Sequence, residues 1–188
     1  ICAACNRGQY SEAGITCNEC KSGFYAPYNE MQNCIPCPAG SYGRIGDDIS
    51  GAGPGGGAKN ISQGCELCPI GQYQGFSGMN KCVECDPGSS CSKVGMTAGE
   101  PCPPGRYSDE RSMIECIACP AGRYQMEAGT AKCAQCQAGK YGPSSASSNA
   151  SYCYACPAGK YTNHEGSAHC NNCTSGQFQD ESGQNKCK

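Results

Sequence analysis

The pattern Cys-x2-Cys-x2-Gly-x-Tyr recurs through this chain of 188 residues with a step of about 17 residues and includes nearly all of its 21 cysteines. A chain with such a fixed period is built from small units that bury surface only against their neighbours. The pattern therefore predicts a tandem array of about ten short modules. Its units begin at Cys2, Cys17, Cys34, Cys65, Cys82, Cys116, Cys133, Cys153 and Cys170, and a further unit at Cys102 lacks its first cysteine, which would fall at Gly99.

The residues that usually build a hydrophobic core are scarce. The chain holds one Leu, two Val, nine Ile, three Phe and no Trp. Such poverty usually signals disorder, but 21 Cys with 27 Gly and 12 Pro indicate a scaffold held by covalent bonds. Each disulfide loop of a dozen or so residues restricts the unfolded chain by about 3 kcal/mol. We therefore expect disulfides to replace burial.

Charge and hydropathy exclude two classes of partner. The formal net charge is −2, and charges of both signs are spread without blocks, so the sequence predicts no nucleic-acid binding and no attraction to an anionic membrane surface. No apolar run approaches the roughly 18 residues that cross a bilayer, and no charged start followed by an apolar stretch stands at Ile1. We expect a soluble, secreted or cell-surface chain, either freed of a signal peptide or cut from a longer protein.

Within a unit, Gly and Pro follow the second cysteine and predict a tight turn, as in Pro120-Ala121-Gly122. The aromatic residue two positions later then starts a short extended stretch that turns again at a second glycine, such as Gly129. No segment has helical periodicity over a useful length. We predict a small disulfide-rich fold, all-β or irregular, made of short hairpins in an elongated array without a large core.

The returning strand of each hairpin brings the second cysteine of one unit near the first cysteine of the next. This loop scheme leaves Cys2 to bond outside the chain, and Cys91, the one cysteine outside the pattern, to bond Cys85. An interleaved scheme, first with third and second with fourth cysteine, stays open. The loop scheme pairs Cys5 with Cys17, Cys20 with Cys34, Cys37 with Cys65, Cys68 with Cys82, Cys85 with Cys91, Cys102 with Cys116, Cys119 with Cys133, Cys136 with Cys153, Cys156 with Cys170 and Cys173 with Cys187.

Two insertions interrupt the step. The larger, Gly43 to Gly64, contains the run GAGPGGG and predicts a flexible projecting loop. A phosphate-binding loop is disfavoured because Lys59 is followed by Asn60 and not by Ser or Thr. The smaller insertion, from Gly142 to Tyr152, is polar.

These departures divide the chain into three segments. Residues 1–84 hold repeats with the Gly-rich insertion at 43–64, residues 85–115 hold variant repeats that lack one regular cysteine, and residues 116–188 hold regular repeats. Asn-x-Ser/Thr sequons make three asparagines candidates for glycosylation, namely Asn60, Asn149 and Asn172.

The Cys-x2-Cys pairs also have the spacing of four-cysteine zinc sites. A zinc arrangement must group the units in twos, leaves Cys102 without its near neighbour and gives Cys91 no role. Redox catalysis needs one reactive pair at a helix start, whereas about ten near-identical pairs indicate a structural use. We therefore expect no metal, no cofactor and no catalytic residue.

The units CPAGRYQMEAGTAKCAQC from Cys119 and CPAGKYTNHEGSAHCNNC from Cys156 resemble the ephrin-receptor-like cysteine-rich repeats of secreted proteins with EGF and CUB modules. The same loop is similar to the single-disulfide module of TNF-receptor ectodomains, and such repeats also occur in protist and algal surface proteins, including flagellar-hair material. The resemblance covers almost the whole chain and departs at Gly99 and at the large insertion. It implies extracellular, disulfide-bonded repeats without enzyme activity.

Two functions fit these features. The first is an extracellular structural protein, a disulfide-stapled rod that acts as a surface-coat or filament building block and associates with itself or with other extracellular proteins. The alternative is the ectodomain of a receptor or adhesion protein that binds a protein ligand along its edge. Near-uniform units without a distinct site favour the first.

Overall fold

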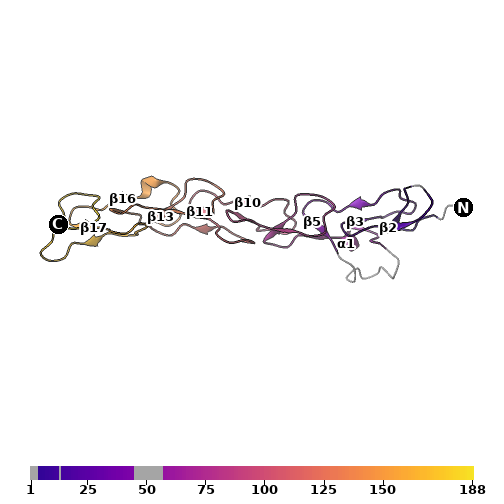
Figure 1. Ribbon diagram of the computed structural model, residues 1–188, viewed down its shortest axis with the longest axis horizontal. Coiled ribbons are helices and arrows are strands. Elements are labelled where there is room, and N and C mark those ends of the chain that lie inside the picture. Colours follow the sequence, from indigo (N-terminus) through magenta and orange to yellow (C-terminus); the bar gives the residue numbers. More distant parts are fainter. Residues whose placement is uncertain (1–3, 13, 45–56) are drawn as a thin grey trace. The chain divides into compact units, whose positions relative to one another are not determined.

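The computed structural model describes residues 4–12, 14–44 and 57–188. Two compact units divide the chain, Ile1–Cys85 with Cys91–Gly99 and Asp86–Ser90 with Glu100–Lys188. Each unit consists of two-stranded hairpins that follow one another in chain order (Figure 1). We call the segment from the second cysteine of one pair to the first cysteine of the next a module and name it by those two positions.

Nine antiparallel hairpins form among the described residues, and each strand has only two or three residues. Strands this short are unstable alone and depend on the disulfides and neighbours. The pairs are β1 (Gln9–Tyr10) with β2 (Asn18–Glu19), β3 (Phe24–Tyr25) with β4 (Ile35–Pro36), β5 (Ser41–Gly43) with β6 (Cys65–Leu67), β7 (Gln72–Tyr73) with β8 (Val83–Glu84), β9 (Ser89–Ser90) with β10 (Glu100–Pro101), β11 (Arg106–Tyr107) with β12 (Ile117–Ala118), β13 (Arg123–Tyr124) with β14 (Ala134–Gln135), β15 (Lys140–Tyr141) with β16 (Tyr154–Ala155) and β17 (Lys160–Tyr161) with β18 (Asn171–Asn172).

From Cys17 onward, the two-residue spacer of each Cys-x2-Cys pair lies in the return strand of a hairpin. In module 119–133, Arg123 pairs with Gln135 and Tyr124 with Ala134. The sequence predicts the hairpin, but it does not reveal this role of the spacer, because two residues show no periodicity. A spacer of two residues fits because each of them pairs with one residue of the opposite strand.

The turn that starts each hairpin follows from its Gly and Pro residues. In module 119–133, the Arg123 amide donates to the Pro120 carbonyl at 3.1 Å, and Gly122 takes a φ of 84°. The Cys136 amide then donates to the Gly122 carbonyl at 2.9 Å and closes the hairpin. A residue with a Cβ would be strained at this φ, so the turn requires glycine.

The buried apolar side chains of the described residues are half-cystines, together with Ala26 and Ala58. The remaining interior is small and polar, with Ser108 and Thr162 at 0% and 1% exposure. These observations confirm the prediction of a small disulfide-rich, nearly all-β fold without a large hydrophobic core. The disulfide is the interior of each module.

The aromatic residue after the turn is only partly buried. We expect each ring to cover a disulfide as a miniature core; Tyr107, Tyr124 and Tyr161 are half-buried, and Phe178 is 59% exposed. In most modules the residue after the aromatic position is buried, because the hairpin points its side chain inward. Examples are Ala26, Gln74, Ser108, Thr162 and Gln179, with Cys91 at the same position after Ser90.

Two short helices lie in the insertions, α1 (Ile61–Gly64) and the 3-10 helix η2 (Ala150–Tyr152). An asparagine begins each helix, since Asn60 accepts from the Gln63 amide and Asn149 from the Ser151 amide, both at 2.9 Å. The GAGPGGG run lies almost wholly outside the described residues, which begin again at residue 57.

One residue in the loop of most modules has a positive φ, and it is usually glycine, but Glu30, Ser112 and Ala146 have φ of 59°, 58° and 56°. The left-handed region costs a residue with a Cβ about 1–2 kcal/mol, while glycine costs about 0.5–1 kcal/mol in unfolded-chain entropy. Ala146→Gly should therefore raise the free energy of unfolding by about 0.5–1 kcal/mol. Denaturant unfolding with intact disulfides measures this.

The matched control is Ala134→Gly in β14, where the backbone is extended and glycine brings only its entropic cost. That variant should lower the free energy of unfolding by about 0.5–1 kcal/mol. If both substitutions destabilise equally, the left-handed backbone at Ala146 carries no strain and the prediction is wrong.

Candidate functional site: the joints between modules

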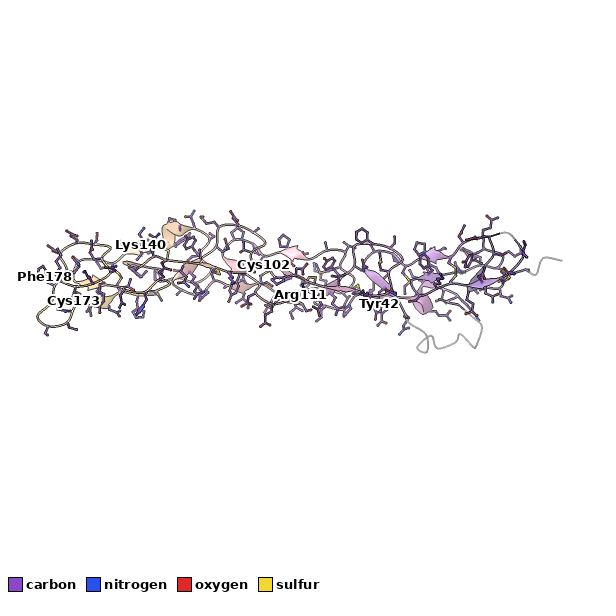
Figure 2. All side chains as sticks on the ribbon, viewed as in Figure 1. Tyr42, Cys102, Arg111, Lys140, Cys173 and Phe178 are labelled. Carbon is purple, nitrogen blue, oxygen red and sulfur yellow. A yellow bond between two sulfur atoms is a disulfide. The ribbon has the colours of Figure 1, made fainter. Side chains whose placement is uncertain are left out.

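Among the described residues, ten disulfides connect the second cysteine of each pair, or Cys102 in the unit that lacks a first cysteine, to a cysteine further along the chain, with Cα–Cα distances from 5.4 to 6.1 Å. Figure 2 shows these bonds among the side chains and labels Cys102 and Cys173. Cys2 lies outside the described residues. The bonds are Cys5–Cys17, Cys20–Cys34, Cys37–Cys65, Cys68–Cys82, Cys85–Cys91, Cys102–Cys116, Cys119–Cys133, Cys136–Cys153, Cys156–Cys170 and Cys173–Cys187.

The two cysteines of a Cys-x2-Cys pair therefore belong to different disulfides, and they differ in burial. In the pair formed by Cys133 and Cys136, Cys136 is buried at 2% exposure, whereas Cys133 is half-buried. The pair formed by Cys116 and Cys119 is an exception, because both of its cysteines are buried. The second cysteine is buried because the next module packs over it. Each pair thus forms a joint, in which one disulfide closes the loop behind and the other opens the loop ahead.

A repeated set of backbone hydrogen bonds connects each module to the next. In the first bond of the set, the turn-glycine amide donates to the carbonyl of the residue that follows the aromatic in the next module, as in Gly122 to Gly142 at 2.7 Å. Equivalent bonds join Gly8 to Ala26, Gly40 to Gln74, Gly71 to Cys91, Gly88 to Ser108, Gly105 to Gln125, Gly139 to Thr162 and Gly159 to Gln179.

The second and third bonds of the set involve the loop of the next module. The amide of the residue after the aromatic donates to a loop carbonyl, as in Gln125 to Ser147 at 3.0 Å, and the positive-φ loop residue donates back to the buried cysteine, as in Ala146 to Cys119 at 2.7 Å. The third bond recurs from Glu30 to Cys5, Gly78 to Cys37, Gly95 to Cys68, Gly129 to Cys102, Gly166 to Cys136 and Gly183 to Cys156.

A further contact reaches from one module to the second module after it. A Cβ placed on Gly122 would overlap the carbonyl oxygen of Gly166, which lies in module 156–170. Modules 119–133 and 156–170 therefore touch through bare backbone. By contrast, a Cβ on Gly159, which has nearly the same φ of 81°, would meet no atom within 4 Å.

A glutamine clamp ties the loop in several modules. The Gln74 side chain donates through Nε2 to the Lys81 carbonyl at 2.8 Å and accepts through Oε1 from the Phe76 amide at 3.1 Å. The same two bonds recur at Gln125 and Gln179. Sequence reasoning missed this clamp, although aromatic-Gln followed seven residues later by Lys appears in all three places.

The variant module retains the joint without a cysteine at residue 99. Cys91 occupies the buried position after the strand β9, bonds to Cys85 and accepts from the Gly71 amide at 2.8 Å. The Gly95 amide donates to the Cys68 carbonyl at 2.8 Å, as its counterparts do elsewhere. The cysteine therefore stands at the inward-facing position 91 and not at position 99. The two hydrogen bonds from Gly71 and Gly95 are the same as at the other joints.

The candidate glycosylation sites differ in setting. Asn60 and Asn149 cap the two short helices with Oδ1, and Asn172 lies exposed in β18 opposite Lys160.

Charge pairs among the described residues are few and exposed. The hydrogen bond that Lys188 donates to Asp180 at 2.6 Å holds the pKa of the Asp180 carboxyl below its ordinary value. It raises the pKa of the Lys188 ammonium in the same way. Arg44 pairs with Glu66 at 3.4 Å and Arg111 with Asp86 at 3.6 Å.

Within the described part of the chain, no group of three or more His, Cys, Asp or Glu side chains is arranged to hold a metal ion. None of the helices formed by these residues has the length and apolar composition that a bilayer span requires.

The segment from residue 105 to residue 153 matches the family model described as tyrosine-protein kinase ephrin type A/B receptor-like. This segment runs from the turn glycine of module 102–116 to the closing cysteine of module 136–153. The resemblance to ephrin-receptor-like cysteine-rich repeats is confirmed over these residues.

Two curated relatives share part of the chain. It is 33% identical over 86 residues to Sushi, von Willebrand factor type A, EGF and pentraxin domain-containing protein 1 of Rattus norvegicus, across 44% of this chain and 2% of that protein. It is 29% identical over 103 residues to laminin subunit gamma-1 of Danio rerio, across 51% of this chain and 6% of that protein. The chain therefore spans only a small part of either relative.

Disulfides persist in oxidising compartments outside the cytosol. The disulfide-bonded modules indicate an extracellular protein, and the family match places ephrin-receptor-like cysteine-rich repeats at residues 105–153.

A comparison of two glycines tests the contact between alternate modules. Gly159→Ala should lower the free energy of unfolding by about 1–2 kcal/mol through backbone strain alone. Gly122→Ala should cost about 1–3 kcal/mol more, because its Cβ must also displace the Gly166 carbonyl.

Denaturant unfolding of both variants with intact disulfides measures the difference. Equal losses at the two positions would mean that modules 119–133 and 156–170 do not touch in solution. Proteolysis of the folded chain gives a second readout, because only Gly122→Ala should loosen the joint and expose its loops.

Proposed function

We propose that the chain is a structural element of an extracellular assembly, a stiff disulfide-stapled rod that serves as a building block of a surface coat or filament. One observation carries this proposal: the same backbone hydrogen bonds recur at successive joints within each unit. Flexibly linked modules would need only a covalent connection. Here backbone hydrogen bonds also fix the position of each module on the next.

The contact between alternate modules supports stiffness further. Bending a joint would either separate the Gly166 carbonyl from Gly122 or push the two together. Neither residue has a side chain that could adapt to the change, so the contact resists bending. Repeat proteins in which each unit contacts only near neighbours grow along one direction. The proposed role is non-catalytic, and it needs no cofactor.

The alternative, a receptor or adhesion ectodomain, would place a ligand site in one distinctive module. Outward-facing positions do carry apolar side chains, such as Phe76 at 71% and Val94 at 60% exposure. Module 68–82 carries three of them, Ile70, Phe76 and Met79, and the others are spread over the rest of the described chain. Exposed apolar side chains are normal for a protein surface. The uniform joints favour the structural role.

Small-angle X-ray scattering of the oxidised chain tests the proposal. A globular chain of this length has a radius of gyration of about 16 Å. We expect a value well above this at high salt, with the cross-section signal of a rod. The control is the reduced and alkylated chain, which should scatter as an unfolded chain of about 46 Å without a rod cross-section. A globular value for the oxidised chain would contradict the proposal.

The sequons Asn60 and Asn149 are proposed to carry glycans. Their Oδ1 atoms face the chain as helix caps, whereas glycans attach to Nδ2, and both residues lie in inserted loops. After secretion from a eukaryotic host, enzymatic removal of N-glycans should reduce the intact mass at both positions. Asn172 should stay unmodified, because the neighbouring Cys173 must form its disulfide. Modification of Asn172 alone would be the opposite result.

A further inference from the structure

The charged side chains of the strands are divided by sign along the chain. Strands β1 to β10 hold four acidic residues and no basic one, namely Glu19, Glu66, Glu84 and Glu100. Strands β11 to β18 hold four basic residues and no acidic one, namely Arg106, Arg123, Lys140 and Lys160. Read along the sequence, the charges look evenly mixed, because loop residues of both signs lie between the strands.

All four basic residues occupy one position of the module, directly before the tyrosine. Their cross-strand neighbours are Ala118, Gln135, Ala155 and Asn172, none of which is charged. Directly opposite positions are where an ion pair across a hairpin would form. The cations are therefore not compensated within their own hairpins. Lys140 is labelled in Figure 2.

The acidic residues lie on the return strands. Glu19 and Glu84 stand opposite Gln9 and Gln72, on the same rung that carries the cations in the later modules. Glu66 and Glu100 lie on the neighbouring rung, opposite Tyr42 and Ser90. These four residues face no basic side chain across their hairpins.

All eight side chains are exposed, and few have a partner within the chain. Glu66 pairs with Arg44 at 3.4 Å, and Arg106 donates through Nη1 to the Cys116 carbonyl at 2.9 Å. The remaining six form no ion pair with another described residue. Segregated charges that are not used inside the chain are available to a surface of opposite sign.

We infer that the strands β11 to β18 of one copy dock on the strands β1 to β10 of a second copy, so that basic and acidic residues pair between chains. This inference rests on the proposed function, because a stiff array repeats its charges at fixed intervals and lets several pairs form together. A second copy of the chain is the partner whose acidic and basic strand residues recur with the same module spacing. Head-to-head contact of like halves would place like charges together and is disfavoured.

The test measures sedimentation of the oxidised chain at ionic strengths from about 10 mM to about 500 mM, since salt screens exposed charges. We expect self-association at low salt that weakens by about tenfold or more at high salt, as several small exposed ion pairs are lost. A monomer at every ionic strength, or association that salt does not change, overturns the inference.

Two charge-reversed variants make the test specific. The first changes Arg106, Arg123, Lys140 and Lys160 to Glu, and the second changes Glu19, Glu66, Glu84 and Glu100 to Lys. Each variant alone should remain monomeric, and an equimolar mixture of the two should associate again because one chain is then acidic in both sets and the other basic. Association of either variant alone, or no association of the mixture, overturns the inference.

The matched control changes four exposed cations outside the strands, Lys21, Lys93, Lys132 and Lys186, to Glu. It alters the net charge as much as the first variant but should still associate. A thiol count on each variant checks that the disulfides have formed. Heparin is the probe for a polyanion partner, and heparin binding by the unmodified chain without self-association overturns the inference. Scattering of the monomer at high salt tests the stiff array separately.

Discussion

The disulfide between one Cys-x2-Cys pair and the next is the constraint on which the rest of the structure depends. Two-residue strands and one-turn helices have no stability of their own, and buried apolar groups other than half-cystines are almost absent from the described residues. Each cross-link holds the ends of a loop together and supplies the main apolar group in its interior. Everything else in a module can be small, polar and exposed, because the covalent bond has replaced the core.

Glycine is the second requirement, and it acts between modules where the disulfide acts within one. The turn glycine bends the chain after the buried cysteine, donates its amide to the next module and leaves room for the carbonyl of the module after that, as Gly122 does with Gly142 and Gly166. Three functions meet at one residue without a side chain. This explains why the motif has glycine at a fixed distance from cysteine, whereas the two residues between them vary.

The sequence predicts the hairpin modules, the coreless fold and the relation to ephrin-receptor-like repeats, because cysteine period and turn residues are local signals. The loop scheme names the same ten pairs that the structure contains. It depends on Cys91, which bonds Cys85 in place of the cysteine that is missing at Gly99. The hydrogen bonds that fix each joint could not be read in this way. They join Gly122 to Gly142 and Ala146 to Cys119 through backbone atoms, which carry no sequence signature.

Because backbone atoms and half-cystines make the joints, the outward side chains of the hairpins are free to vary without cost to the fold. Module 136–153 shows the same freedom in its loop: residues are added around η2, yet Ala146 and Ser147 still make the usual bonds to the preceding module. In this module the added residues therefore enter after the contacts with the preceding module and before the closing cysteine. In module 37–65 residues are added before the contact instead, because the Ala26 amide donates to the carbonyl of Ala58, which lies beyond the GAGPGGG run of the large insertion. An architecture of this kind separates scaffold from surface, so the charge of successive strands can be set by what the array must meet and not by what holds it together.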